Sequence, residues 1–395
     1  MNCVIKLAMN VAIGVALFSI LQPQIEAKLP PNGVAIIPAE RVGNYLRVNA
    51  VVNGKSLRLI VDSGAGLNVL TNEAAKIAGI EGGQAIQASG AGSGVTQARI
   101  VTVKEFRVGN VIVKGDAAVV LELPKVLNCD GLVGYSFLRH FATTFDYDAN
   151  TITIRNSGEY KPSSGEVEGK LRVRNNHPQV MGRIAGESGW MVIDTGNNGT
   201  TSILKWLVDK ANLVKTWPVS DEYIVGKGTG GQIKGYAAIS PGFDISGVSI
   251  PKGQVTLDSS GVGAFADKDI LANIGAEHLR RFRMTLDYAA QKAYFGKSKA
   301  YDSPLQVDRS GLRIDSMLTK QIVVGVVKGS PGDLAGVKVG DTVLEINGKK
   351  TDEVEPMLFS IDLRQRAGSL VRLKVSREGR VLEASFKLED LIKQL

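Results

Sequence analysis

A stretch of sixteen residues occurs twice in this chain of 395 residues, and this repeat restricts the possible folds more than any other feature. Residues 134–149 and 275–290 align without a gap at an offset of 141 positions. Eight positions are identical, namely Gly134/Gly275, Leu138/Leu279, Arg139/Arg280, Phe141/Phe282, Thr144/Thr285, Asp146/Asp287, Tyr147/Tyr288 and Ala149/Ala290. Self-similarity at a fixed spacing is the signature of a duplicated structural unit. The sequence therefore predicts two related lobes, followed by a region without a counterpart in either.

Both units place the same parts in the same order. An apolar segment runs into an acidic turn, at residues 57–64 and again at residues 190–196. A glycine-rich segment follows at residues 84–99 and 224–236, and the alternating apolar residues beside it predict a β-hairpin in each unit. Glycine is frequent, with 45 residues, and aromatic residues make up only 6% of the chain. We therefore expect a fold class that is all-β dominated.

Each acidic turn carries an aspartate, a hydroxyl residue and a glycine, in the triplets Asp62-Ser63-Gly64 and Asp194-Thr195-Gly196. Two facing carboxylates can cleave an amide with one water, because the ionised one takes a proton from water and the protonated one donates to the carbonyl. Like charges about 3 Å apart cannot both ionise, so the pair retains one proton. The hydroxyls would orient the carboxylates, and the glycines would let backbone N–H groups approach them. One such triplet is an ordinary turn, whereas two at matched places predict that Asp62 and Asp194 are catalytic.

The two triplets resemble those of the aspartic peptidase family, both its pepsin-like bilobal members and its retroviral-type dimers. The segments Leu132-Val133-Gly134 and Asn273-Ile274-Gly275 support the resemblance, which covers about residues 34–295. It implies aspartic-protease-type β lobes at residues 34–156 and 167–296, with the two hairpins as flaps that close over a bound polypeptide. It also implies an activated water, with no metal and no cofactor. Three departures from the family are Asn197 in place of Ala or Ser, Asn273 in place of an apolar residue, and a first flap without an aromatic residue.

The C-terminal region, expected as an α+β domain at residues 305–390, resembles PDZ domains. Residues 325–348 carry the resemblance, and Asn347-Gly348 is a strong signal for a type I′ hairpin turn. The PDZ carboxylate-binding loop falls on Gly311, Leu312, Arg313 and Ile314, with Arg313 in place of the usual Gly. The resemblance implies that peptide C-termini or internal segments bind there, beside a helix at about residues 354–366. Two alternatives are a domain that serves only in packing and a groove that holds the end of this chain, residues 393–395.

The N-terminal residues 1–27 are typical of a signal peptide. Lys6 precedes an apolar run over residues 7–21, which is short for a membrane span, and Ala27 offers a small residue for cleavage. We expect an exported protein of the periplasm or cell envelope, with an uncleaved N-terminal anchor as the alternative. Cleavage would leave Cys129 as the only cysteine and no internal disulfide.

Other chemistries find little support in the sequence. The three histidines (His140, His177 and His278) are widely spaced, which argues against a zinc hydrolase and predicts no metal site. The formal charge of +8 is scattered and predicts no nucleic-acid partner. A trypsin-like protease with a PDZ domain would need a Gly-Asn-Ser-Gly-Gly motif, which the sequence lacks. The predicted function is an aspartic endopeptidase acting on polypeptides, and the alternative is a catalytically degenerate peptide-binding or adaptor protein of the cell envelope.

Overall fold

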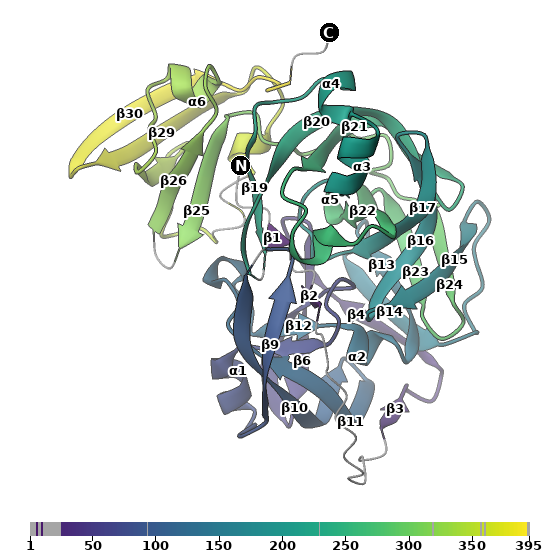
Figure 1. Cartoon of the computed structure of the whole chain (residues 1–395). Coiled ribbons are helices and arrows are strands. Elements are labelled where there is room, and N and C mark those ends of the chain that lie inside the picture. The colour runs from purple at the N-terminus through teal and green to yellow at the C-terminus, as the bar shows by residue number, and fades with distance from the viewer. Residues whose placement is uncertain are drawn as a thin grey trace.

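The computed structural model describes residues 5–6, 9–10, 25–92, 94–228, 230–317, 320–355, 358 and 361–392 (Figure 1). Strands dominate them, and they form three sheets with a few short helices. Two of the sheets belong to the lobes, and the third forms the C-terminal domain. The fold is therefore mostly β, as the sequence predicts.

The first lobe is built on a sheet with the strand order β2-β9-β10-β11-β8-β12-β7-β6-β5, to which β3 adds on β11. Its strands are β2 (Met9–Asn10), β3 (Glu26–Lys28), β5 (Glu40–Val42), β6 (Tyr45–Val52), β7 (Lys55–Val61), β8 (Asn68–Leu70), β9 (Gln84–Gly90), β10 (Val95–Val108), β11 (Val111–Val120) and β12 (Gly131–Val133). Its short helices are α1 (Asn72–Ile77), η1 (Lys125–Leu127) and α2 (Tyr135–Leu138). The buried faces of these strands are rich in Val, Leu and Ile, which suit a pleated surface.

A second sheet, of fourteen strands, forms the second lobe and also includes three strands from residues 34–156 of the first unit. Its order is β1 (Ile5–Lys6), β19 (Tyr223–Gly228), β20 (Gly231–Ile245), β21 (Val248–Asp258), β18 (Ser202–Ile203), β22 (Ile270–Gly275), β17 (Glu187–Asp194), β16 (His177–Ile184), β15 (Val167–Arg174), β24 (Lys292–Lys297), β23 (Phe282–Asp287), β13 (Phe141–Asp146), β14 (Thr151–Asn156) and β4 (Val34–Pro38). Its helices are α3 (Lys205–Lys210), α4 (Leu213–Thr216), η2 (Gly263–Ala266) and α5 (Ala276–Leu279).

The repeated segments meet in the middle of this sheet. Strand β13 pairs antiparallel with β23, and Thr144 lies opposite Thr285, its partner at the offset of 141. Their hydroxyl oxygens are 2.8 Å apart. One cluster of buried apolar side chains runs through both lobes, so the duplicated units share a core. The repeat in the sequence thus corresponds to two lobes that face each other across this strand pair.

The C-terminal domain has its own sheet and its own core. The strands are β25 (Leu312–Met317), β26 (Lys320–Val326), β27 (Thr342–Ile346), β28 (Lys349–Lys350), β29 (Leu370–Arg377) and β30 (Arg380–Lys387), with α6 (Pro331–Leu334) and η3 (Asp362–Arg364). Asn347 and Gly348 have φ of 50° and 80°, as a type I′ turn requires. The helix expected at residues 354–366 falls partly on residues 356–357 and 359–360, which lie outside the described residues.

The expected signal peptide also lies largely outside the described residues. Of its last residues, Glu26 and Ala27 form β3 with Lys28 and pair with β11, so a cut after Ala27 would fall within this strand. In the part of the chain that the structure describes, no helix has the length and apolarity to cross a membrane.

Candidate active site

Two parallel strand pairs deliver the aspartates to the interface between the lobes. Strand β7 runs parallel to β12 and ends at Val61, so Asp62 begins the turn that follows. Strand β17 runs parallel to β22 and ends at Asp194 itself. Both carboxyl groups are fully buried, with no exposed surface on either residue. The structure therefore brings the two sequence-predicted aspartates into the same buried layer.

Ser63 and Thr195 connect the two aspartate-bearing turns across the interface between the lobes. The backbone N–H of Ser63 donates to Oγ1 of Thr195 at 2.9 Å, and the N–H of Thr195 donates to Oγ of Ser63 at 3.0 Å. Each hydroxyl then donates to a strand of the opposite lobe, Ser63 to the carbonyl of Ile193 at 2.8 Å and Thr195 to that of Val61 at 3.0 Å. These four reciprocal bonds hold the two turns in one geometry.

The two glycines of the triplets permit the close approach of the carboxylates. A Cβ atom at Gly64 would lie 2.2 Å from Oδ1 of Asp194, and one at Gly196 would lie 2.2 Å from Oδ2 of Asp62. Each carboxylate therefore lies directly against the turn that carries the other one. Any residue with a side chain at either position would push the aspartates apart.

The two carboxylates have unequal hydrogen-bond partners. Oδ1 of Asp62 accepts the backbone N–H of Gly64 at 2.7 Å, whereas its Oδ2 is buried with no hydrogen-bond partner among the described residues. Oδ1 of Asp194 accepts the N–H of Asn197 at 3.0 Å, and Oδ2 accepts the side-chain amide of Asn273 at 2.7 Å. Burial, and next the neighbouring Asp194 carboxylate, hold the pKa of Asp62 well above its ordinary value. The site can therefore hold one proton on a buried carboxyl pair.

The glycine-rich segments form the two hairpins that the sequence predicts. Strands β9 and β10 make the first flap, and β19 and β20 make the second. Their tips meet, because the N–H of Gly94 donates to the carbonyl of Gly230 at 2.7 Å. A Cβ at Gly92 would lie 2.4 Å from the backbone of Gly230, so this contact requires glycine. Two short N-terminal segments add strands to the flaps, β1 parallel to β19 and β2 antiparallel to β9.

A small cavity of about 30 Å³ opens beside Asn273 in the second lobe. Val192, Leu204, Phe265 and Ile270 give it an apolar wall, and Arg174, His177 and Asp267 lie at its polar side. Asn273, which donates to Asp194, is the lining residue that links this cavity to the carboxylates.

The residues expected to form the PDZ loop lie against the second flap. Gly311 has a φ of +74°, and a Cβ there would lie 2.2 Å from the side chain of Ser330. Arg313 is buried, donates to Oδ2 of Asp308 at 3.0 Å and stacks on the ring of Tyr223, the first residue of β19. Leu312 and Ile314 point into the core of the domain. The contact between loop and flap was not predicted, because nothing in the sequence relates Arg313 to Tyr223.

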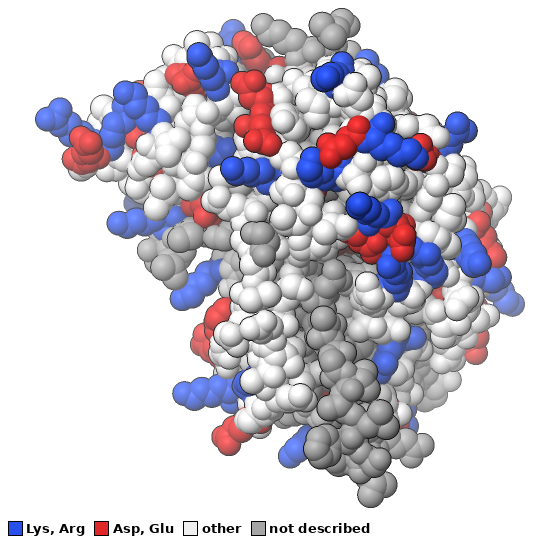
Figure 2. Space-filling model, viewed as in Figure 1, with Lys and Arg blue, Asp and Glu red and all other residues white. Residues whose placement is uncertain are grey.

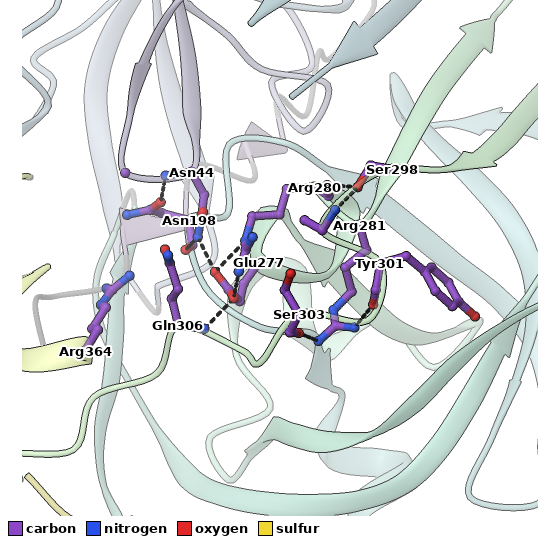
Figure 3. A network of polar contacts seen from close by, with 12 residues as sticks. Asn44, Asn198, Glu277, Arg280, Arg281, Ser298, Tyr301, Ser303, Gln306 and Arg364 are labelled. Atoms are coloured by element: carbon purple, nitrogen blue, oxygen red, sulfur yellow. Dashed lines mark hydrogen bonds and ion pairs between the residues drawn. The ribbon is translucent and has the colours of Figure 1, made fainter. Parts of the chain in front are cut away.

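A buried polar network lies near α5, and the sequence did not predict it (Figure 3). Glu277 is fully enclosed and accepts from Nδ2 of Asn44 at 2.8 Å, from the backbone N–H of Gln306 at 2.6 Å and from Arg280 at 2.6 and 3.1 Å. These donors come from the first lobe, from the segment that leads to the C-terminal domain and from Arg280, the residue that follows α5. The paired position in the first unit is Ser136, so the repeat alone did not indicate an acidic residue here.

The described residues show few features of the other chemistries that the sequence argues against. Within the described ranges, no group of three or more His, Cys, Asp or Glu side chains could hold a metal ion. Burial raises the pKa of the Cys129 thiol to about 12, which keeps it protonated and unreactive. Basic side chains are scattered among acidic ones on the face seen in Figure 2, with no continuous basic stripe.

Comparisons with known proteins match two parts of the chain to families. Residues 48–137, in the first lobe, match the aspartyl protease family, and residues 322–377 match the PDZ domain family. Among solved structures, the chain is similar to the aspartic proteinase from Irpex lacteus, with a TM-score of 0.45 and 12% identity, covering 68% of this chain and 99% of that one.

The curated relatives share only short stretches with the chain. Carboxyl-terminal-processing peptidase 3, chloroplastic, of Arabidopsis thaliana is 41% identical over 54 residues, which is 14% of this chain and 10% of that protein. The probable periplasmic serine endoprotease DegP-like of Chlamydia pneumoniae is 37% identical over 73 residues, 18% of this chain and 15% of that protein. The serine protease Do-like HtrA of Lactobacillus helveticus is 36% identical over 83 residues, 20% of each. The chain thus spans a fifth or less of the length of each of these relatives. The family matches show that this chain contains an aspartyl protease domain, matched in its first lobe, followed by a C-terminal PDZ domain.

Proposed function

We propose that this protein is an aspartic-type endopeptidase that hydrolyses peptide bonds of polypeptides with a water activated by Asp62 and Asp194. The observation that carries the proposal is the close contact of the two turns. Ser63 and Thr195 exchange hydrogen bonds across the lobes, and each carboxylate lies against the glycine of the opposite triplet. The matched family and the buried, proton-sharing pair support the same chemistry.

The reaction follows from a carboxyl pair that holds one proton. The ionised carboxylate takes a proton from water, whose oxygen forms a bond to the carbonyl carbon, while the protonated carboxyl donates to the carbonyl oxygen. The tetrahedral product then breaks its C–N bond, and a proton returned from the pair leaves with the amine. Hydrogen bonds from the turns orient both groups before the substrate arrives, which lowers the cost of reorganisation.

The flaps favour an extended polypeptide as the substrate of the site. Both hairpins have edges to which an extended segment can add, since β1 pairs with β19 and β2 pairs with β9. A polypeptide that lies across the site would gain the same main-chain hydrogen bonds and would place side chains in pockets such as the one beside Asn273. The tips of the flaps meet at Gly94 and Gly230, and flaps that close over a bound substrate would keep bulk water out.

We assign to the PDZ domain the binding of peptide C-termini or internal segments of substrates, with an exported, envelope location for the whole protein. The domain match and the position of Gly311–Ile314 beside the second flap support substrate delivery to the cleft. The apolar run over residues 7–21 supports export.

The decisive experiment is cleavage of denatured protein mixtures at pH 4 to 6 by the wild type and by Asp62→Asn, with pepstatin as an independent probe. Asp146→Asn is the matched control, because Asp146 belongs to the repeat but accepts the backbone N–H groups of Asp148 and Ala149 in a turn. We expect cleavage by the wild type and the control and none by Asp62→Asn. Equal cleavage by all three would exclude the dyad. Peptide binding without cleavage by the wild type would favour the alternative, a cleft that retains binding and has lost turnover.

A further inference from the structure

The two aspartates differ in one hydrogen bond, because the side-chain amide of Asn273 donates to Asp194. We infer that Asn273 decides which aspartate carries the shared proton: its side chain holds Asp194 as the ionised acceptor and leaves the proton to Asp62. Asn273 is then a positioning residue of the site. Leu132 stands at the paired position of the first unit, so the duplicated lobes differ at the residue that faces the carboxylate.

The orientation of Asn273 follows from a chain of hydrogen bonds that starts at a backbone group. The N–H of Gly199 donates to Oδ1 of Asn197 at 3.0 Å, and a backbone N–H can only donate. Nδ2 of Asn197 is therefore the donor toward Oδ1 of Asn273, at 2.7 Å. This leaves Nδ2 of Asn273 to face Oδ2 of Asp194, also at 2.7 Å. All three side chains are buried.

Both oxygens of Asp194 therefore face fixed donors. Oδ1 accepts the N–H of Asn197, and Oδ2 accepts the amide of Asn273. A proton on either oxygen would use one of its lone pairs and weaken that oxygen as an acceptor for the donor it already faces. Hydrogen bonds to the charged form favour that form. The amide of Asn273 therefore makes the proton less favourable on Asp194.

Asp62 offers the complementary environment. The backbone N–H groups of Gly64, Ala65 and Gly196 favour its charged form, but its Oδ2 is buried and receives no well-formed hydrogen bond from the described residues. Ala65 supplies a backbone N–H to Asp62 as Asn197 does to Asp194, whereas Leu132, at the position of Asn273, has no side-chain donor. An unpaired, desolvated carboxylate oxygen gains most from a proton, which turns it into a donor.

Among the described residues, two tyrosine hydroxyls also interact electrostatically with the pair. Tyr147 and Tyr288 act on the aspartates from the ends of β13 and β23, and burial raises the pKa of both hydroxyls, so they remain neutral. Arg41 and Arg280 act on Tyr147 in turn. Around the cavity beside Asn273 lie Arg174, His177 and Asp267. The catalytic part of the inference rests on the proposed function: Asp194 would be the base toward water, and Asp62 the acid toward the carbonyl oxygen.

A test that needs no activity compares the thermal unfolding of Asp62→Asn and Asp194→Asn at pH 6. Asn at position 62 can accept from Gly64 through its oxygen and present its NH₂ group at the unpartnered Oδ2 position. Asn at position 194 must turn its NH₂ group toward Asn197 or Asn273, which both donate. We expect the midpoint temperature of Asp194→Asn to be lower than that of Asp62→Asn by roughly 3 °C or more, as one unsatisfied buried group implies. Equal midpoints, or the reverse order, would overturn the inference.

The double variant Asp194→Asn/Asn273→Leu separates this conflict from a general loss of packing. Leu removes the opposing donor, so the drop caused by Asp194→Asn should be at least halved in the Asn273→Leu background. Additive drops would count against a direct contact between the two groups. These readouts stand even if the wild type cleaves nothing, so they fail independently of the proposed function.

The pH profile tests the catalytic role. In Asn273→Leu the carboxylate of Asp194 loses one donor, so the acid limb of kcat/KM should move upward by about one to two pH units. A merely structural role would lower kcat/KM at every pH without moving the limb. An unchanged limb in a variant that remains folded and active would therefore refute the assignment.

Discussion

The guanidinium carbon of Arg313 lies 3.8 Å from the centre of the Tyr223 ring, and this contact joins the PDZ domain to the second flap. Arg313 is also bound to Asp308, so its position over the ring is fixed from the PDZ side. Tyr223 begins β19, and the far end of that hairpin meets the first flap at Gly230. A ligand that displaced Arg313 would therefore act on the second flap.

We predict that Arg313→Gly, which restores the residue usual in PDZ loops, loosens the second flap. A desolvated stack of a guanidinium on an aromatic ring contributes about 2 kcal/mol, so amide exchange in residues 223–236 should become roughly tenfold faster or more. Hydrogen exchange followed by mass spectrometry measures this. Tyr223→Phe keeps the ring face and should retain most of the protection. Unchanged exchange in Arg313→Gly would show that the stack does not restrain the flap.

The exchange of hydrogen bonds between Ser63 and Thr195 leads to a second prediction. Thr195→Val keeps the shape of the side chain but leaves the N–H of Ser63 and the carbonyl of Val61 without their partner. We expect the free energy of unfolding to fall by about 2 to 4 kcal/mol, because both groups stay buried. Urea denaturation measures the loss, and Thr195→Ser, which keeps the hydroxyl, serves as the control. A loss below about 0.5 kcal/mol, the range of ordinary surface changes, would contradict the cross-lobe role.

The sequence predicts the lobes well because their main determinants are local or repeated. The offset of 141 marks residues that lie opposite each other, as Thr144 and Thr285 show. The two triplets and the glycine-rich hairpins have signals in short windows, and the structure places them at one interface. The match of residues 48–137 to the aspartyl protease family agrees with this interpretation.

The contacts that the sequence did not predict all depend on how distant segments pack. Asn197 and Asn273 were recognised as departures from the family, but their hydrogen bond to each other spans 76 positions. Arg313 meets Tyr223, and Glu277 meets Asn44, across domain or lobe boundaries. Such pairs have no spacing or period that a single sequence could reveal, because only the folded arrangement brings them together.

Glu277 gives a third prediction, since it joins three parts of the molecule (Figure 3). Glu277→Ala leaves the guanidinium of Arg280 buried and unpaired, and also leaves the amide of Asn44 and the N–H of Gln306 without an acceptor. We expect the free energy of unfolding to fall by about 3 to 5 kcal/mol. Glu122→Ala is the control, because Glu122 is exposed and its bond to Asn72 should contribute about 0.5 kcal/mol or less. Losses of similar size in both variants would show that the network does not stabilise the junction.

The last prediction concerns the stability of the fold at acid pH. His278 is buried in α5, and its Nδ1 accepts the backbone N–H of Thr201 at 3.1 Å, which requires a neutral ring with the hydrogen on Nε2. Burial, and next the charges of Arg281 and Arg280, lower the pKa of His278 to about 3 from its ordinary value of 6.5. The ring of His278 packs edge-to-face against that of Phe243, with the two centroids 5.4 Å apart.

The sign of the effect follows from linkage. Between pH 6.5 and pH 3 the unfolded chain binds a proton at His278 that the folded chain does not. The contribution of the neutral ring is complete above pH 6.5 and is lost as the pH falls, by about 1.4 kcal/mol for each pH unit. His278→Asn offers an acceptor to Thr201 but cannot titrate, so its stability should fall less steeply over this range. Urea denaturation midpoints from pH 7.5 to pH 4 would measure both slopes. Parallel curves would mean that His278 gains its proton in the folded state without cost, which would contradict the prediction.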